Sequence, residues 1–172
     1  MNIKQSKMRK VVLFAALIFG AVFLNEANAQ QISQNALGLR VGDGGGFGAE
    51  VSYQRATREN NRLEFDLGWR NDSNYDAIKL VGLYQWVWNI EGGFNWYAGA
   101  GAGLGNYDDN RRGDIDRNDG VFALLAGNVG IEYNFDFPLL LSLDFRPEIG
   151  FSDYDDHDEF TPDIALGIRY QF

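Results

Sequence analysis

The sequence lacks several features on which whole classes of protein depend. It contains no cysteine, so disulfides, thiolate catalysis and cysteine-based metal sites are excluded. After residue 24, no apolar run reaches the roughly 20 residues that a membrane-spanning helix needs. Basic residues are also scarce, since Gln30–Phe172 holds 11 of them against 23 acidic residues, a formal charge of −12. The sequence therefore disfavours nucleic-acid binding, which requires a basic patch.

The first 29 residues have the pattern of a secretory signal peptide. Basic residues between Lys4 and Lys10 precede the apolar run Val11–Leu24, and Ala27–Ala29 provides a small-x-small cleavage motif. A run of about 14 apolar residues is too short for a comfortable membrane anchor. We therefore expect a signal peptide over residues 1–29, cleaved after Ala29, and one mature domain over residues 30–172.

The mature chain contains segments in which apolar side chains alternate with small or polar ones. This period of two is typical of a β-strand with one apolar face. The pattern is most regular over 164–172, where every even-numbered position is apolar. Pro147 conflicts with it, because proline cannot donate a ladder hydrogen bond, and predicts an irregularity or a strand end. The eight predicted strands cover residues 36–42, 47–55, 62–70, 77–88, 94–104, 121–134, 139–149 and 164–172.

The connections between these strands alternate in length. Short ones follow the second, fourth and sixth strands, whereas the two longest, 106–119 and 152–163, fall at the opposite end. Eight strands of roughly ten residues, with short inner turns and longer outer loops, are typical of a membrane barrel. Aromatic residues also collect beside the short turns, as a girdle at the headgroup level would. They are Tyr53, Trp86, Trp88, Phe94, Trp96, Tyr133, Phe135, Tyr170 and Phe172.

The two faces of the predicted sheet differ in bulk and in charge. One carries aromatic and large aliphatic side chains, and the other carries glycines with five basic and six acidic residues. The bulky face is too large for the inside of a narrow eight-stranded barrel, so we expect it to face lipid. A soluble lipocalin-like barrel, with its apolar face inside, is the alternative. The predicted interior charges are Arg40, Arg70, Lys79, Arg146, Arg169, Glu50, Glu64, Asp66, Glu132, Asp144 and Glu148.

An eight-stranded barrel leaves room only for side chains, so we expect a packed polar interior rather than a channel. Burying charges is costly unless they are paired. Arg40 and Glu50 are nearly equidistant from the Gly44–Gly46 turn and are predicted to face each other across that hairpin. The alternative is a narrow path for ions or protons through the barrel.

The sequence offers few groups for catalysis or metal binding. The single histidine, His157, lies in the acidic outer loop Asp153–Glu159, with Ser152 nearby, and could form a Ser/His/acid arrangement acting on lipid A. Asp114–Gly120 resembles a calcium loop, but its glycine is one place late and no glutamate follows at the expected distance. We expect no catalytic, cofactor or metal residue, although Asp153–Glu159 could collect divalent cations beside lipopolysaccharide.

With strands, girdle and a terminal aromatic strand together, Leu37–Phe172 resembles the small outer-membrane β-barrel family of the OmpA/OmpX type. The resemblance implies an eight-stranded antiparallel up-and-down barrel in the outer membrane, without a cofactor. It also implies that Ile164–Phe172 is the signal read by the barrel assembly machinery. The implied role is non-enzymatic and at the cell surface, in envelope integrity, adhesion or lipopolysaccharide contact, and we expect a monomer. A lipid A-modifying enzyme and a narrow pore are the alternatives.

Overall fold

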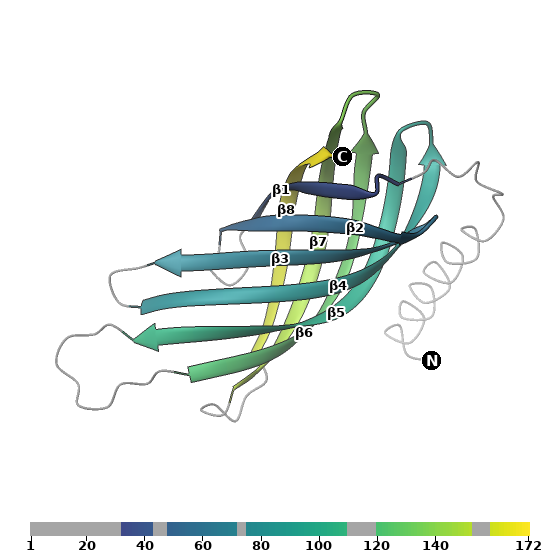
Figure 1. Cartoon of the computed structure of the whole chain (residues 1–172). Coiled ribbons are helices and arrows are strands. Elements are labelled where there is room, and N and C mark those ends of the chain that lie inside the picture. The colour runs from purple at the N-terminus through teal and green to yellow at the C-terminus, as the bar shows by residue number, and fades with distance from the viewer. Residues whose placement is uncertain (1–31, 43–47, 72–74, 110–119, 153–158) are drawn as a thin grey trace, which may run out of the picture.

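The described residues form eight antiparallel strands that close into a barrel (Figure 1). The structure is a computed structural model that describes residues 32–42, 48–71, 75–109, 120–152 and 159–172. Each strand pairs with its neighbour in the chain, and β8 returns to pair with β1. The strands are β1 (Asn35–Gly42), β2 (Ala49–Arg58), β3 (Asn61–Asn71), β4 (Tyr75–Glu91), β5 (Phe94–Asp109), β6 (Gly120–Asn134), β7 (Leu139–Ser152) and β8 (Glu159–Gln171).

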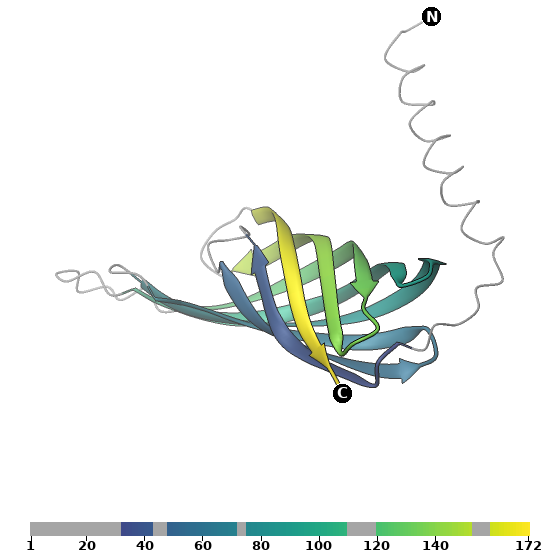
Figure 2. The same cartoon turned by 90° about the horizontal axis from the view of Figure 1, so that it is seen from above.

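The barrel closes where β1 lies beside β8, as Figure 2 shows. This seam runs from Ala36 opposite Gln171 to Gly42 opposite Ala165. Just past the end of β8, Phe172 exchanges two backbone hydrogen bonds of 3.0 and 2.9 Å with Asn35, the first residue of β1. The alternating segment that is clearest in the sequence is therefore the strand that completes the hydrogen-bonded ring. A closed ring leaves no sheet edge unpaired, which removes the edge that open sheets must protect.

All eight predicted strands are confirmed, but several are longer than predicted. β5 continues to Asp109, and β8 begins at Glu159 rather than at Ile164, so residues expected in outer loops belong to strands. The backbone pairing of these strands continues past the predicted bounds, since Tyr75 of β4 lies opposite Asp109 of β5 and Gly150 of β7 lies opposite Glu159 of β8. Apolar alternation was the signal for the prediction, and it fades toward the outer strand ends although the backbone pairing persists. Two of the three short turns were overestimated, since β4 and β5 are joined by Gly92 and Gly93 alone, whereas the predicted turn over 135–138 is confirmed.

Pro147 interrupts one ladder without ending its strand. Because Asn35 and Phe172 exchange both bonds, even-numbered residues of β8 bond toward β1 and odd-numbered ones toward β7. Pro147 lies opposite Pro162, so its nitrogen faces β6 instead. There the pairing skips from Ala126–Glu148 to Val129–Phe145 and keeps its register. The expected irregularity is confirmed, and the alternative that β7 ends at this point is wrong.

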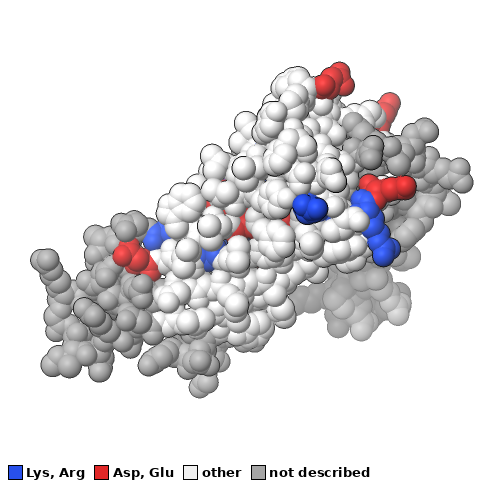
Figure 3. Space-filling view, in the orientation of Figure 1, with Lys and Arg blue, Asp and Glu red and all other residues white. Residues whose placement is uncertain are grey.

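The orientation of the two faces agrees with the prediction from side-chain bulk. The large apolar side chains of alternate positions are exposed on the outside, among them Leu39, Phe65 and Ile168. The charged and amide side chains between them are buried in the interior. The face in Figure 3 is accordingly mostly uncoloured, with only scattered acidic and basic side chains. A soluble barrel would show the reverse arrangement, which the fold therefore excludes.

β4 departs from the simple pattern because apolar residues occupy both of its faces. Val81 and Leu83 point inward and pack with Leu124 and Ala126 of β6 into a buried cluster. Opposite this cluster the inward positions of the neighbouring β5 are glycines, Gly101 and Gly103, and these leave room for the branched side chains of Leu83 and Val81. The interior is therefore polar along most of the wall and apolar where β4 and β6 approach each other across β5.

Candidate functional site: the ion-paired interior

The outer half of the barrel interior is organised around two arginines from opposite ends of the chain. Arg40 of β1 forms ion pairs with Asp144 (2.6 Å) and Glu50 (3.1 Å), and a third with Asp163. Its pairing with Glu50, predicted from the hairpin, is confirmed both by register and by contact. Because the partners come from β2, β7 and β8, this one guanidinium ties together strands that are distant in the sequence.

Arg146 of β7 extends this network toward β2 and β3. Its guanidinium contacts Glu50 at 2.6 Å, Asp66 at 2.8 Å and Glu148 at 2.9 Å, and its side chain is fully buried. Lys79 of β4 pairs with Glu148 at 3.0 Å and lies 3.4 Å from Glu50. Glu50 is thus shared by three cations, which makes the outer layer a single connected unit rather than a set of separate pairs.

The middle layer is held by Arg169 of β8. Its guanidinium donates to the hydroxyls of Ser52 (2.9 Å) and Ser142 (2.8 Å) and contacts Glu64 at 3.2 Å. Gln54 donates a further hydrogen bond to Glu64. Arg169 therefore reaches across the barrel from β8 to β3, and all of its partners point inward from alternate positions of their strands.

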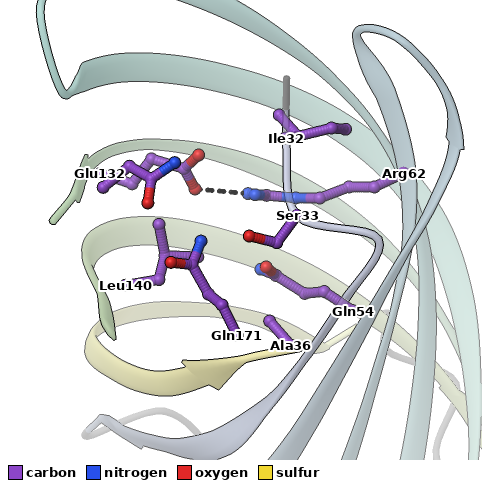
Figure 4. A pocket seen from close by; sticks show the side chains of 9 residues that line it. Ile32, Ser33, Ala36, Gln54, Arg62, Glu132, Leu140 and Gln171 are labelled. Carbon is purple, nitrogen blue, oxygen red and sulfur yellow. Dashed lines mark ion pairs between the residues drawn. The ribbon is translucent and has the colours of Figure 1, made fainter. Parts of the chain in front are cut away.

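The layer next to the short turns is built around Arg62. It pairs with Glu132 at 2.7 Å, donates to Gln85 at 2.6 Å and stacks 4.8 Å above the ring of Tyr97. Figure 4 shows Arg62 and Glu132 pointing toward each other across the pocket at this end. The cavity there measures about 10 Å³, enough for one water molecule.

Residues ahead of β1 cover the same end of the barrel. Ile32 is buried against Val87 and Tyr97, and Figure 4 places it with Ser33 at the rim of the pocket. The amide of Ala56 donates to the carbonyl of Gln34 at 2.9 Å, which fixes this segment to β2. No pattern in the sequence predicted this contact, because Ile32 lies outside every alternating segment.

Because many ion pairs connect its side chains, this interior is suited to stabilising a rigid barrel rather than to transporting ions or solutes. Each charge loses several kcal/mol of hydration on burial, and only close, multiple pairing offsets that loss. The described interior meets this requirement, since its arginines each contact two or more acceptors. The predicted packed polar interior is therefore what the described residues form.

The structure buries two charged residues that the sequence analysis missed. Arg62 lies just before the predicted third strand's first apolar residue, and Asp163 was assigned to an outer loop. Both share the parity of recognised interior residues, Arg62 with Glu64 and Asp163 with Arg169, and that parity could have identified them. Of the eleven predicted interior charges, Arg70 is only half-buried and the other ten are buried.

The residues weighed for chemistry mostly fall outside the described ranges. His157 and residues 114–119 lie outside them, and the placement of the Ser152 and Glu159 side chains is not described. Within the described ranges, no three histidine, aspartate or glutamate residues are grouped so that they could hold a metal ion. Across these same ranges, no helix has the length and apolarity to cross a membrane.

These features define a class: a closed eight-stranded barrel with apolar side chains outside and a packed, ion-paired interior. Solved structures of the same architecture are Neisserial surface protein A (13% identity, TM-score 0.60) and the N-terminal barrel of Pseudomonas aeruginosa OprF (13%, 0.59). The matches cover 80% and 81% of this chain, and 94% and 100% of those chains.

A further match is Ail, the attachment invasion locus protein of Yersinia pestis, with 17% identity and a TM-score of 0.58 over 81% of this chain and 97% of that one. No protein-family model and no curated protein matches the sequence. The fold is therefore that of the small eight-stranded transmembrane barrels, as the resemblance in the sequence implied.

Proposed function

We propose that this protein is an integral outer-membrane barrel with a non-enzymatic structural or surface-interaction role. The observation that carries the proposal is the contrast between the two faces of the wall. Bulky apolar side chains cover the outside, and ion pairs fill the inside. In a closed barrel the backbone N–H and C=O groups of the strands hydrogen-bond to neighbouring strands, which is necessary because hydrocarbon offers them no hydrogen-bond partner. Envelope integrity, adhesion or lipopolysaccharide contact through the outer loops are the roles that such a platform supports.

The named neighbours support the surface role in a general way. One is called a surface protein and another an attachment invasion locus protein, and both share this architecture at low identity. For partners we propose outer-membrane lipid with lipopolysaccharide, and the barrel assembly machinery through the strand that ends at Phe172. We propose a monomer, since the β1–β8 seam leaves no edge that demands a second chain.

The orientation of the wall is tested by spin labels at two adjacent positions of β7. The native chain has no cysteine, so Leu141→Cys and Ser142→Cys each provide a unique attachment site. Leu141 is 38% exposed and Ser142 only 5%, so the label at 141 should collide with lipid-dissolved oxygen and the label at 142 should not. The opposite ranking would overturn the proposal. If the thiol at position 142 does not react with the label in the folded barrel, that lack of reaction also shows that position 142 faces the interior.

Location is tested by cell fractionation and by unboiled gel electrophoresis. We expect the protein in the outer-membrane fraction, with one mobility before boiling and another after it, because a closed barrel resists detergent. Recovery from the soluble periplasm without a mobility shift would contradict the proposal.

Two activity measurements separate this role from the alternatives. The packed interior predicts no stable conductance in planar bilayers, and the non-enzymatic role predicts unchanged lipid A after incubation with the purified protein. Steady single-channel currents would favour the pore. Modification of lipid A that disappears in His157→Ala would favour the enzyme.

A further inference from the structure

The aromatic belt next to the short turns is incomplete. On β4–β8 the outward positions near the periplasmic ends carry rings that touch one another, such as Trp88 stacked on Trp96 at 4.3 Å and Phe94 against Tyr133 at 4.6 Å. On β1–β3 the corresponding ends carry polar and basic residues instead, below Tyr53. We name this interruption the polar gap and define it as Asn35, Arg55, Thr57, Arg58 and Asn61.

Arg55 points from the wall toward lipid, unlike the arginines of the interior. It lies opposite Leu63 on one side and Asn35 on the other, and it shares the outward parity of Tyr53. Its neighbour Gln54 points inward and is buried, whereas Arg55 is exposed. Since β2 continues to Arg58, the α-carbon of Arg55 lies within the ladder and not at a turn.

Arg55 lies beside the aromatic belt and is exposed, so its guanidinium is available to an anion. No carboxylate among the described residues forms an ion pair with Arg55 or Arg58. A long arginine stem can follow an apolar surface while the guanidinium reaches the headgroup level, and its planar fork matches the oxygens of a phosphate. Arg58, at the end of the same strand, adds a second cation, and the recess beside it is lined by Ser33, Gln34, Thr57, Arg58 and the acidic Glu59.

We propose that the polar gap binds the phosphate of a phospholipid in the periplasmic leaflet, with Arg55 as the principal contact and Arg58 as the second. A second copy of this chain is a poorer occupant, because a two-fold interface centred here would bring like charges together. The proposal rests on the membrane-spanning orientation argued above. It goes beyond it in assigning one position on the wall to one headgroup chemistry.

Native mass spectrometry of the mature protein in detergent, titrated with dioleoylphosphatidylglycerol, tests the proposal. Arg55→Gln should weaken the tightest lipid binding about fivefold, as expected for the loss of one arginine near a lipid headgroup. Arg55→Lys should retain only part of the affinity, because it keeps the charge but loses the planar fork. Arg70→Gln is the matched control, since it removes the same charge near the outer end of β3 and should leave this binding unchanged.

Several outcomes would overturn the inference. Equal lipid affinity in wild type and Arg55→Gln would show that Arg55 does not bind the lipid. An equal loss of affinity in Arg70→Gln would show that lipid binding depends only on the net charge of the protein. Displacement of the lipid by equimolar inorganic phosphate would indicate a free-anion site, and a dimer lost in Arg55→Gln would indicate a protein interface. The labels at 141 and 142 separate the two proposals: a lipid-facing Leu141 together with an unaffected Arg55→Gln would contradict only this inference.

Discussion

Replacing Arg146 with methionine is expected to lower the free energy of unfolding by about 3–5 kcal/mol, the cost of removing one partner from a buried ion pair. Methionine fills much of the same volume, so the loss reports charge rather than a cavity. Without the guanidinium, Glu50, Asp66 and Glu148 lose contacts of 2.6 to 2.9 Å in a fully buried setting. The measurement is urea unfolding in lipid vesicles, followed by tryptophan fluorescence and by gel mobility.

Two controls separate the network from a general effect of charge. Arg55→Gln also removes one arginine charge, but from the outside of the wall, and should change stability by less than about 1 kcal/mol. Adding Glu50→Gln to Arg146→Met should recover part of the loss, because it removes one of the stranded carboxylates. A destabilisation below about 1 kcal/mol in Arg146→Met would show that the outer layer does not hold the barrel together.

Gly101→Val is expected to prevent the barrel from closing normally, with a loss of about 3 kcal/mol or failure to show the folded gel mobility. A β-carbon at Gly101 would overlap the backbone carbonyl of Gly82 and approach the α-carbon of Leu83 to 2.8 Å. Backbone atoms cannot yield as a flexible side chain does, so β4 and β5 would have to separate. These strands have the longest ladder in the barrel, from Tyr75–Asp109 to Glu91–Phe94.

The adjacent Ala100→Val provides the matched control. Ala100 is exposed on the outer face, one residue from Gly101, and the same substitution there adds methyl groups on the lipid side. It should fold with wild-type mobility and with stability within about 0.5 kcal/mol of it. If both variants fold equally well, the inward glycines of β5 are not required for close packing.

Much of the fold could be predicted because the alternation of residues within a barrel strand indicates which of its side chains face outward and which face inward. Every second side chain of Ile164–Phe172 is apolar, and the structure places these on the outside with Gly167 and Arg169 inside. The turn after β1 fixes which residues face each other locally, so Arg40 opposite Glu50 followed from their distance to that turn. The ends of β5 and β8 did not follow, because hydrogen-bonded pairing continues where apolar alternation stops.

The interior site was predictable in composition but not in its contacts. Which charges face inward follows from parity within each strand, and this identified Arg146 and Glu64. That Arg146 pairs with Asp66, eighty positions away, follows only once the ring is closed and its strands are tilted. The position of Ile32, which covers the end with the short turns, was not predicted, because it depends on what lies across the barrel rather than along a strand.

By itself, the sequence determined the number of strands, the face that each side chain occupies and the excess of charge inside over outside, because these depend on a period of two along one strand. Only the tertiary structure decided which arginine meets which carboxylate, where Ile32 covers the end with the short turns and where the aromatic belt is interrupted beside Arg55. Those features depend on how far each strand is shifted relative to its neighbours around the closed ring. The residue pattern within one strand does not determine that shift.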